Sequence, residues 1–182
     1  MQPSSFFEIE LKSLLTKEEY DRLFNELPKM AKLINEETIN TTRYRPGDVR
    51  LRHSDKTLEV VCKEGDPTKI CRREVVIPLA DKNQIDHFAQ VFDLLQFKPD
   101  RPWEKYKLEF EHDYNGFKYI LCLQNIKDFA YILEVEFISE EDTSHIHEPN
   151  LRAIISNLGL EPIEPAEFTR RIGEFMSGKK LI

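Results

Sequence analysis

Apolar and charged residues alternate one by one in several short stretches of the chain. This is the pattern of β-strands that bury one face, because successive side chains of a strand point to opposite sides. Residues 6–12 show it most clearly, and they predict a strand with one apolar and one charged face. The two faces comprise Phe7, Ile9 and Leu11 on one side and Glu8, Glu10 and Lys12 on the other.

The same alternation predicts further strands along the chain. Residues 33–45 are expected to be extended and to end at Pro46-Gly47, and Asn115-Gly116 predicts a tight hairpin turn. The remaining predicted strands are residues 48–53, 57–63, 70–79, 103–112, 117–123 and 131–138.

Two helices are predicted in the first half of the chain. Residues 16–19 form a capping box that begins the first helix, and Pro28 is expected to end it. Asp81 is expected to cap the second helix, with Gln84 three residues later. Its apolar stripe comprises Ile85, Phe88, Val91, Phe92 and Leu95.

Two more helices are predicted in the second half. One has Pro149 near its first turn and ends at Gly159. The other, at about 165–176, carries apolar residues at helical spacing and is expected to dock on the rest of the chain, with residues 177–182 fraying.

The charged faces of the predicted strands form a recurring set. If the helices cover the apolar faces, the charged faces converge on the other side of the sheet, which is either a solvated surface or the polar interior of a closed antiparallel barrel. Clustered carboxylates favour hard divalent cations, whereas clustered Arg and Lys favour phosphate oxygens, so mixed charges in one cavity suit a polyphosphate bound through metal. The set comprises Glu8, Glu10, Lys12, Arg50, Arg52, Lys105, Lys107, Glu109, Glu111, Glu134 and Glu136.

Length and composition narrow the class of protein. The 182 residues are expected to form one domain, and a formal net charge of −7 argues against nucleic-acid binding through bulk electrostatics. No signal-peptide pattern and no apolar run of about 18 residues is present, so a cytoplasmic protein without a membrane anchor is expected. Cys62, Cys71 and Cys122 are interpreted as reduced, mostly buried residues, and the five histidines as surface or structural.

Several of these motifs occur in the order of a known superfamily. Glu8-x-Glu10-x-Lys12 resembles the N-terminal ExExK signature of the CYTH, or triphosphate tunnel metalloenzyme, superfamily, which includes class IV adenylyl cyclases, thiamine triphosphatases and inorganic triphosphatases. Later motifs follow in the same order as in the family, and the resemblance spans residues 6 to about 160. These motifs are Arg50-x-Arg52, Lys63 at the end of a strand, Arg72-Arg73-Glu74, Lys105-x-Lys107 and Glu134-x-Glu136.

The resemblance implies one α+β domain over residues 1–182, with a closed antiparallel barrel of about eight strands and helices outside. It implies that Mg²⁺ or Mn²⁺ is held by Glu8, Glu10, Glu134 and Glu136, and that Glu8, Glu10 and Lys12 take part in catalysis. The phosphate chain would be bound by Lys12, Arg50, Arg52, Lys63, Arg72, Lys105 and Lys107.

The implied function is metal-dependent hydrolysis of a small-molecule triphosphate, such as tripolyphosphate or an organic or nucleoside triphosphate. A class IV-type cyclase that makes cyclic AMP from ATP, and a weakly catalytic polyphosphate- or nucleotide-binding module, remain alternatives. A homodimer is possible through the barrel rim or the last helix, although such apolar stripes more often form intramolecular core.

The chain departs from the family pattern at a few positions. Gln124 stands where the family usually has Asp, and the glycines expected after it are replaced by residues 127–130. The second basic pair is Lys-Lys, where an Arg is common. Arg43 and Arg45 precede the Arg50 strand. They extend the basic wall, contact the leaving portion of a substrate, or lie in an exposed loop, and the exposed loop is the favoured interpretation.

Overall fold

The computed structural model describes residues 2–177, and its strands form one antiparallel sheet. The strands are β1 (Ser4–Leu15), β2 (Lys32–Arg45), β3 (Val49–His53), β4 (Leu58–Lys63), β5 (Cys71–Pro78), β6 (Lys98–Pro99), β7 (Trp103–Tyr114), β8 (Phe117–Ile126) and β9 (Ala130–Ser139).

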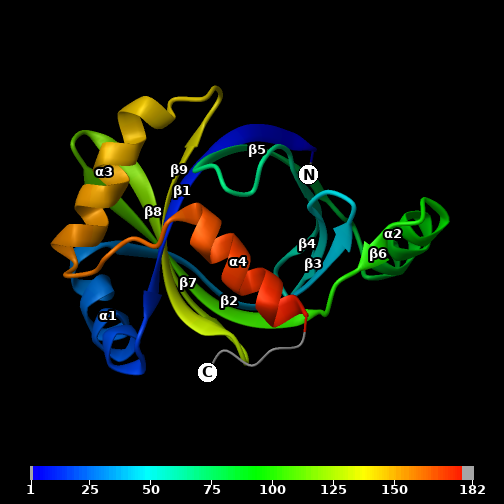
Figure 1. The fold of residues 1–182 in the computed structure, drawn as a ribbon, viewed down its shortest axis with the longest axis horizontal. Coiled ribbons are helices and arrows are strands. Elements are labelled where there is room, and N and C mark those ends of the chain that lie inside the picture. The colour runs from blue at the N-terminus through cyan, green and yellow to red at the C-terminus, as the bar shows by residue number, and fades with distance from the viewer. Residues whose placement is uncertain (1, 178–182) are drawn as a thin grey trace.

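Eight of these strands form a ring (Figure 1). Their order is β3-β4-β5-β1-β9-β8-β7-β2, and β2 pairs in turn with β3, from Asn40 opposite His53 to Tyr44 opposite Val49. The short β6, which the sequence pattern does not reveal, pairs with the end of β2. The predicted closed antiparallel sheet of about eight strands is therefore confirmed.

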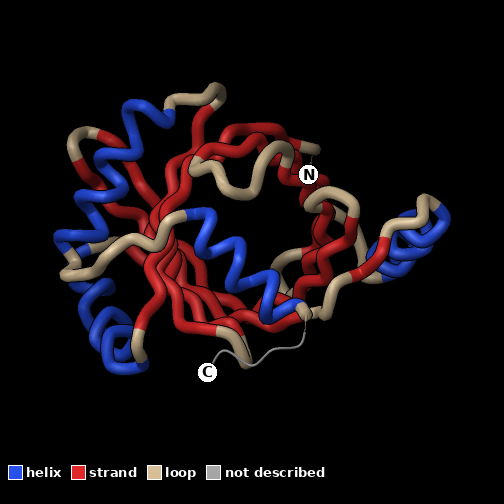
Figure 2. The backbone as a smooth tube through the Cα atoms, in the orientation of Figure 1, coloured by secondary structure: helices blue, strands red, loops and turns tan. Residues whose placement is uncertain are grey.

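Four helices accompany the ring (Figure 2). The helices α1 (Lys17–Met30) and α3 (Ser144–Asn157) pack against the outer face of β1, β7, β8 and β9. Leu23 of α1 and Leu151 of α3 are completely buried there. The apolar side of the alternating strands therefore faces outward into this core, and the charged side faces into the ring. The other two helices are α2 (Asn83–Leu94) and α4 (Pro165–Met176).

The predicted capping box begins α1. The Thr16 hydroxyl accepts a hydrogen bond from the Glu19 amide, and the Glu19 carboxylate accepts one from the Thr16 amide. The prediction that Pro28 ends this helix is wrong, because α1 continues to Met30. Proline has a helical φ, so in the last turn it removes one hydrogen bond without preventing two further helical residues.

The prediction places the start of α3 too late. Pro149 lies inside this helix, which begins at Ser144. The helix ends before Gly159, whose φ of +73° lies in the left-handed region that glycine adopts without strain.

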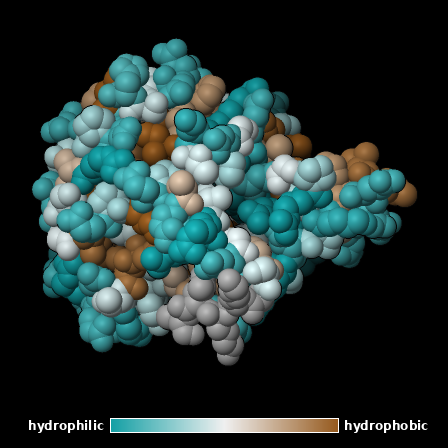
Figure 3. Space-filling view, in the orientation of Figure 1, coloured by the Kyte–Doolittle hydropathy of each residue, from teal (hydrophilic) through white to brown (hydrophobic). Residues whose placement is uncertain are grey.

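The helix α2 projects from the side of the ring (Figure 1). Asp81 accepts a hydrogen bond from the Asn83 amide, but Lys82 occupies the N-cap position. Phe92 is the buried residue of the predicted stripe, whereas Val91 is 45% and Leu95 59% exposed. Figure 3 shows apolar surface at this projecting end of the molecule. No helix in residues 2–177 is long and apolar enough to cross a membrane.

The helix α4 crosses one opening of the ring (Figure 1). Phe175 is 1% exposed and packs against Phe129, at a ring-centroid distance of 5.0 Å. The Thr169 hydroxyl donates a hydrogen bond of 3.1 Å to the Pro67 carbonyl, on the loop between β4 and β5. The apolar stripe of this helix is thus covered within the chain. The predicted fraying of the C-terminus concerns residues 177–182, of which 178–182 lie outside the described residues.

Candidate active site

A cavity of about 310 Å³ lies inside the ring, and charged side chains from most of its strands line it. Because side chains alternate along a strand, charges at every second position of a strand point to the same side of the sheet and can line the same cavity. Every site residue predicted from the sequence lines the cavity. These residues are Glu8, Glu10, Lys12, Arg50, Arg52, Lys63, Arg72, Lys105, Lys107, Glu134 and Glu136.

Three carboxylates meet on the wall formed by β1 and β9. Glu8, Glu10 and Glu136 each offer an oxygen, and these atoms lie within 4.8 Å of one another. Glu136 is only 8% exposed and has no hydrogen bond or ion pair with any described residue. Three convergent carboxylates are the donor set of a hard divalent cation, so the residues present fit Mg²⁺ or Mn²⁺.

Burial and mutual repulsion change the titration of these acids. Burial, together with the nearby Glu10, raises the pKa of Glu8 to about 7, against the opposing effect of Lys63. Burial and the charge of Glu8 raise the pKa of Glu136 well above its usual range. The pKa of Glu10 is lowered instead, because Lys12 and Lys63 outweigh its burial.

Glu134 lies outside this group of three. Its two oxygens are 2.7 Å from the Lys12 Nζ and 3.0 Å from the Gln124 Nε2. Lys12 also lies 2.5 Å from Glu10, so it bridges Glu10 and Glu134, two of the four carboxylates predicted to bind metal. Four carboxylates were expected to hold metal, and the structure brings three of them together.

Several basic side chains of the cavity are held by carboxylates. Lys63 contacts both Glu8 and Glu74, the latter at 3.0 Å. Arg52 lies 3.3 Å from Glu59, and its Nε is buried without a hydrogen-bond partner. The cavity wall therefore holds at least one guanidinium donor that a ligand oxygen can satisfy.

Asp48 connects two of the predicted arginines. Its carboxylate binds Arg50 at 2.7 Å and Arg72 at 3.0 Å. Burial alone would raise the pKa of Asp48, but these two guanidinium groups hold it well below its usual range. Asp48 therefore stays ionised and fixes both arginines at the cavity wall.

Lys105 differs from the other basic residues. No carboxylate of the described chain lies within ion-pair distance of it, and its nearest polar partner is the Gln124 Oε1 at 3.5 Å. Burial and the charge of Arg52 lower its pKa to about 8. An amide at position 124 thus leaves a half-buried ammonium group without a counter-ion.

The structure also places the residues that the sequence pattern leaves open. Arg72 lies 8% exposed in the cavity, whereas Arg73 points outward and pairs with Glu64. The exposed-loop interpretation of Arg43 is wrong: it lies in β2, lines the cavity and binds Asp100 at 2.6 Å. Arg45 binds the same Asp100 from outside the cavity, with its side chain 62% exposed.

Glu109 and Glu111 separate in the same way. Glu109 lines the cavity and accepts hydrogen bonds from Lys107 and Asn35, whereas Glu111 binds Lys118 near the hairpin turn, outside the cavity.

The cysteines differ from the prediction that they are mostly buried. Cys62 is exposed and Cys71 is half-buried, so Cys122 is the buried one. Cys122 faces the cavity, and its thiol lies 3.7 Å from the Glu109 carboxylate. His147 is structural, as expected, since it stacks on Phe137 and bonds with the Tyr119 hydroxyl.

Several further residues line the cavity but were not predicted from the sequence. Asp48 directly precedes the Arg50 strand, and Glu59 and Glu74 share strand parity with Lys63 and Arg72, so alternation is the signal that would find them. The α4 residues Phe168, Thr169 and Ile172 also line the cavity. No local pattern assigns them to it, because an apolar helical stripe does not reveal its partner.

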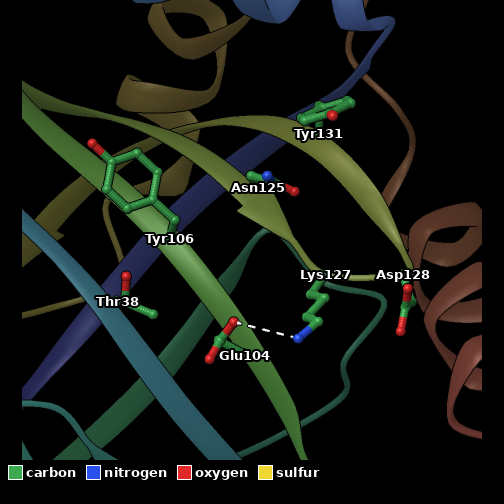
Figure 4. A pocket seen from close by; sticks show the side chains of 7 residues that line it. All are labelled: Thr38, Glu104, Tyr106, Asn125, Lys127, Asp128 and Tyr131. Atoms are coloured by element: carbon green, nitrogen blue, oxygen red, sulfur yellow. Dashed lines mark ion pairs between the residues drawn. The ribbon is translucent and has the colours of Figure 1, made fainter.

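A second cavity, of about 370 Å³, lies outside the ring (Figure 4). It is a groove between Tyr106 and Tyr131, with Asn125 between them, and its charged residues include Glu104 and Lys127, which pair at 4.0 Å. Its few charges are of both signs and largely exposed, in contrast to the dense charges of the inner cavity.

Solved structures of known proteins share this ring. The candidate adenylate cyclase of Bacillus halodurans is 17% identical, with a TM-score of 0.63, over 87% of this chain and 93% of that chain. HpAC1 from Hippeastrum, a candidate adenylyl cyclase whose structure is described with a dominant triphosphatase activity, is 16% identical over 97% of both chains, with a TM-score of 0.60.

The chain has the CYTH, or triphosphate tunnel, fold. A conserved protein from Pyrococcus furiosus has the same fold, with 20% identity, a TM-score of 0.66 and coverage of 87% of this chain and 95% of its own. No protein-family model matches the sequence, and no curated protein matches it. The inner cavity is the tunnel of this fold, and the fold agrees with the resemblance seen in the sequence.

Proposed function

We propose that the protein is a divalent-metal-dependent hydrolase of triphosphate substrates. The observation that carries this proposal is the presence of two unpaired charged groups in one tunnel among the described residues. They are the buried Glu136 carboxylate, without a cation, and the half-buried Lys105 ammonium, without an anion. A phosphate chain accompanied by a divalent cation supplies the missing partner of each.

The basic wall suits a chain of phosphates. Lys and Arg neutralise its charge, and guanidinium groups can bind its oxygens through two parallel hydrogen bonds. The unpaired Nε of Arg52 and the ammonium of Lys105 are free to do so without breaking an existing ion pair with a carboxylate. The remaining predicted phosphate ligands are Lys12, Arg50, Lys63, Arg72 and Lys107.

The carboxylate wall suits the cation. Glu8, Glu10 and Glu136 would hold it, with Glu134 positioned beside them through Lys12. When bound, a divalent cation stabilises the negative charge on the phosphate oxygens during transfer.

The residues of the chain have separate tasks in hydrolysis. The basic side chains hold the phosphates in place and stabilise charge as the terminal phosphoryl group is transferred. Glu8 would hold the cation together with Glu10 and Glu136, which places it where it can orient a water for attack on the terminal phosphorus. Lys12, held between Glu10 and Glu134, would position a phosphate oxygen close to that water.

Hydrolysis is favoured over cyclisation. A cyclase must bind an adenine and present the ribose 3′-hydroxyl to the α-phosphorus. Among the described residues that line the tunnel, Gln124 is the one side chain with a neutral amide, and no Asn is present. Gln124 is already engaged with Lys105 and Glu134. The same fold also carries the dominant triphosphatase activity described for HpAC1.

One assay tests the proposal. The purified protein is offered tripolyphosphate, ATP or thiamine triphosphate with Mg²⁺ or Mn²⁺, and phosphate release and cyclic AMP are both measured. Metal-dependent phosphate release is expected. Cyclic AMP without phosphate would instead indicate the cyclase, and binding of these compounds without turnover would indicate a binding module.

Two variants test the carboxylate wall. Glu10→Gln and Glu136→Gln are expected to lower metal-dependent turnover by about 100-fold or more, because each removes a charged ligand at the reaction site. The exposed Glu140→Gln serves as the matched control. Full activity in either tunnel variant, with circular dichroism unchanged, would remove that residue from the proposed metal site.

A further inference from the structure

A second group of possible ligands lies in the tunnel beside the carboxylate wall. Glu109, Cys122 and Glu136 come from the consecutive strands β7, β8 and β9, and each offers a ligand atom within 4.8 Å of the others. Glu109 and Cys122 lie directly opposite each other in the pairing of β7 with β8. The position of the three side chains is therefore set by the sheet itself, not by a mobile loop.

The chemistry of this group differs from that of the three carboxylates. A thiolate is a soft ligand that selects zinc and related ions, whereas Mg²⁺ and Mn²⁺ prefer oxygen. Zinc is commonly held by three protein ligands and one exchangeable ligand where it contacts substrate. One sulfur and two carboxylates would leave its fourth position for a ligand in the tunnel.

The unpartnered Glu136 is an independent sign that a cation belongs here. Its carboxylate is 8% exposed, lines the tunnel and has no hydrogen bond or ion pair among residues 2–177. A buried carboxylate without a partner is costly, and a bound cation offsets that cost. Glu136 belongs to both ligand groups, so it can face either cation or bridge the two.

The present partners of Glu109 are compatible with metal binding. Asn35 donates a hydrogen bond of 2.7 Å to one of its oxygens, which leaves the other, Oε1, facing Cys122. Lys107 lies 2.8 Å from that Oε1, but it also lies 3.5 Å from Glu37. The Lys107 ammonium can therefore turn to Glu37 when a cation takes its place.

We propose that Glu109, Cys122 and Glu136 form a second metal site, which binds a thiophilic divalent cation of the Zn²⁺ class. On binding, the metal–sulfur bond forms as the thiol proton leaves to solvent. The site adjoins the phosphate-binding wall, so an ion held there would contact the substrate or block its entry. It does not depend on the proposed hydrolase activity.

Cd²⁺ titration of the purified full chain, without any triphosphate, tests the site. Bound to thiolate, Cd²⁺ has an ultraviolet charge-transfer absorption that carboxylate ligands do not produce. The wild type is expected to develop this band with one equivalent of Cd²⁺ and to keep it in excess Mg²⁺. Zn²⁺ is expected to displace Cd²⁺ and abolish the band.

Variants assign the band to the proposed ligands. Cys122→Ser is expected to abolish it, whereas the matched control Cys62→Ser, at an exposed thiol, is expected to keep it. Glu109→Gln retains the thiol, so it is expected to keep the band but to weaken Cd²⁺ binding by about tenfold or more.

Three results would overturn the proposal: no band in the wild type, a band that survives Cys122→Ser, or unchanged Cd²⁺ affinity in Glu109→Gln. Because the readout is absorption, these results are independent of whether the protein hydrolyses triphosphates. Glu109→Gln keeps the test decisive even if Cys122→Ser does not fold.

Discussion

Lys105 is a tunnel side chain whose charge changes just above neutral pH. With a pKa of about 8 it is mostly protonated at pH 7 and loses its charge as the pH rises further. We expect kcat/KM for a triphosphate to fall above pH 8, because this parameter reports the ionisation of the free enzyme. Lys105→Arg keeps a positive charge at all relevant pH values and should remove that decline.

Replacing Lys105 by a neutral residue tests whether its charge contributes to substrate binding. Lys105→Met is expected to lower kcat/KM by about tenfold or more, since a charge-assisted hydrogen bond to phosphate is worth about 1.5–3 kcal/mol. Lys118→Met, on the outer end of the hairpin, is the matched control. Equal kcat/KM for Lys105→Met and the wild type would show that the unpaired ammonium does not bind substrate.

In the absence of metal, the ionisation of Glu8 makes the free energy of unfolding depend on pH. Its pKa is about 7 in the folded chain, above its ordinary value of 4.5, so the folded state binds a proton more tightly than the unfolded state between these values. This contribution to the free energy of unfolding is complete below pH 4.5 and is lost as the pH rises to 7, by up to about 3 kcal/mol.

We therefore expect Glu8→Gln to become more stable relative to the wild type between pH 5 and pH 8. Urea unfolding in the presence of a chelator measures the difference, with Glu140→Gln as the control. A difference that stays constant with pH would contradict the raised pKa of Glu8 in the folded chain.

Strand alternation predicted which residues line the tunnel, but not how they group around a ligand. Charges at every second position, as in Arg50 and Arg52, mostly line the cavity, whereas Glu111 at the end of its strand does not. Asp48 shares the parity of Arg50 and Arg52, but it lies just before the strand, and the Cys122 thiol resembles any small apolar residue in a strand. The set of carboxylates that meet at the proposed metal site was not predictable either. Glu134 points into the tunnel, as expected, but its oxygens contact Lys12 and Gln124.

Among the elements, the first helix shows most directly how a local motif contributes to stability. Thr16→Ala removes the hydroxyl that accepts from the Glu19 amide, and we expect it to lower the free energy of unfolding by about 1 kcal/mol. Thr143 offers a matched control, since it holds the N-cap position of α3 without a side-chain cap hydrogen bond. A loss in Thr143→Ala as large as that in Thr16→Ala would rule out the cap as the cause.

Elements with strong local patterns were predicted close to their observed bounds. The hairpin at Asn115-Gly116 and the helix at 165–176 are examples. The two prolines inside helices were misread, because their tolerance depends on the turn they occupy. The two-residue β6 has no pattern at all, and its existence depends on its pairing with β2.

At the scale of the whole molecule, ligand binding should stabilise the closed ring. A cation that binds only the folded chain raises the free energy of unfolding by about 2.7 kcal/mol at 100 times its Kd. For a chain of this size that corresponds to a rise in Tm of roughly 5–10 °C. We expect Mn²⁺ to produce such a shift in thermal denaturation, and a chelator to reverse it.

Glu136→Gln should greatly reduce the Mn²⁺-induced shift in Tm, because it removes a carboxylate from the set that gathers the cation. Glu140→Gln should retain it. An equal shift in both variants would place the stabilising ion elsewhere on the molecule.

The position of α4 across one opening of the ring limits how a polymer can be handled. Phe168 and Ile172 line the tunnel from this helix, and Thr169 ties it to the opposite rim. For the proposed hydrolase, we expect α4 to keep a long polyphosphate from passing through both openings, so that only a chain terminus enters the cavity. Such an enzyme would remove phosphate from chain ends and leave internal linkages intact.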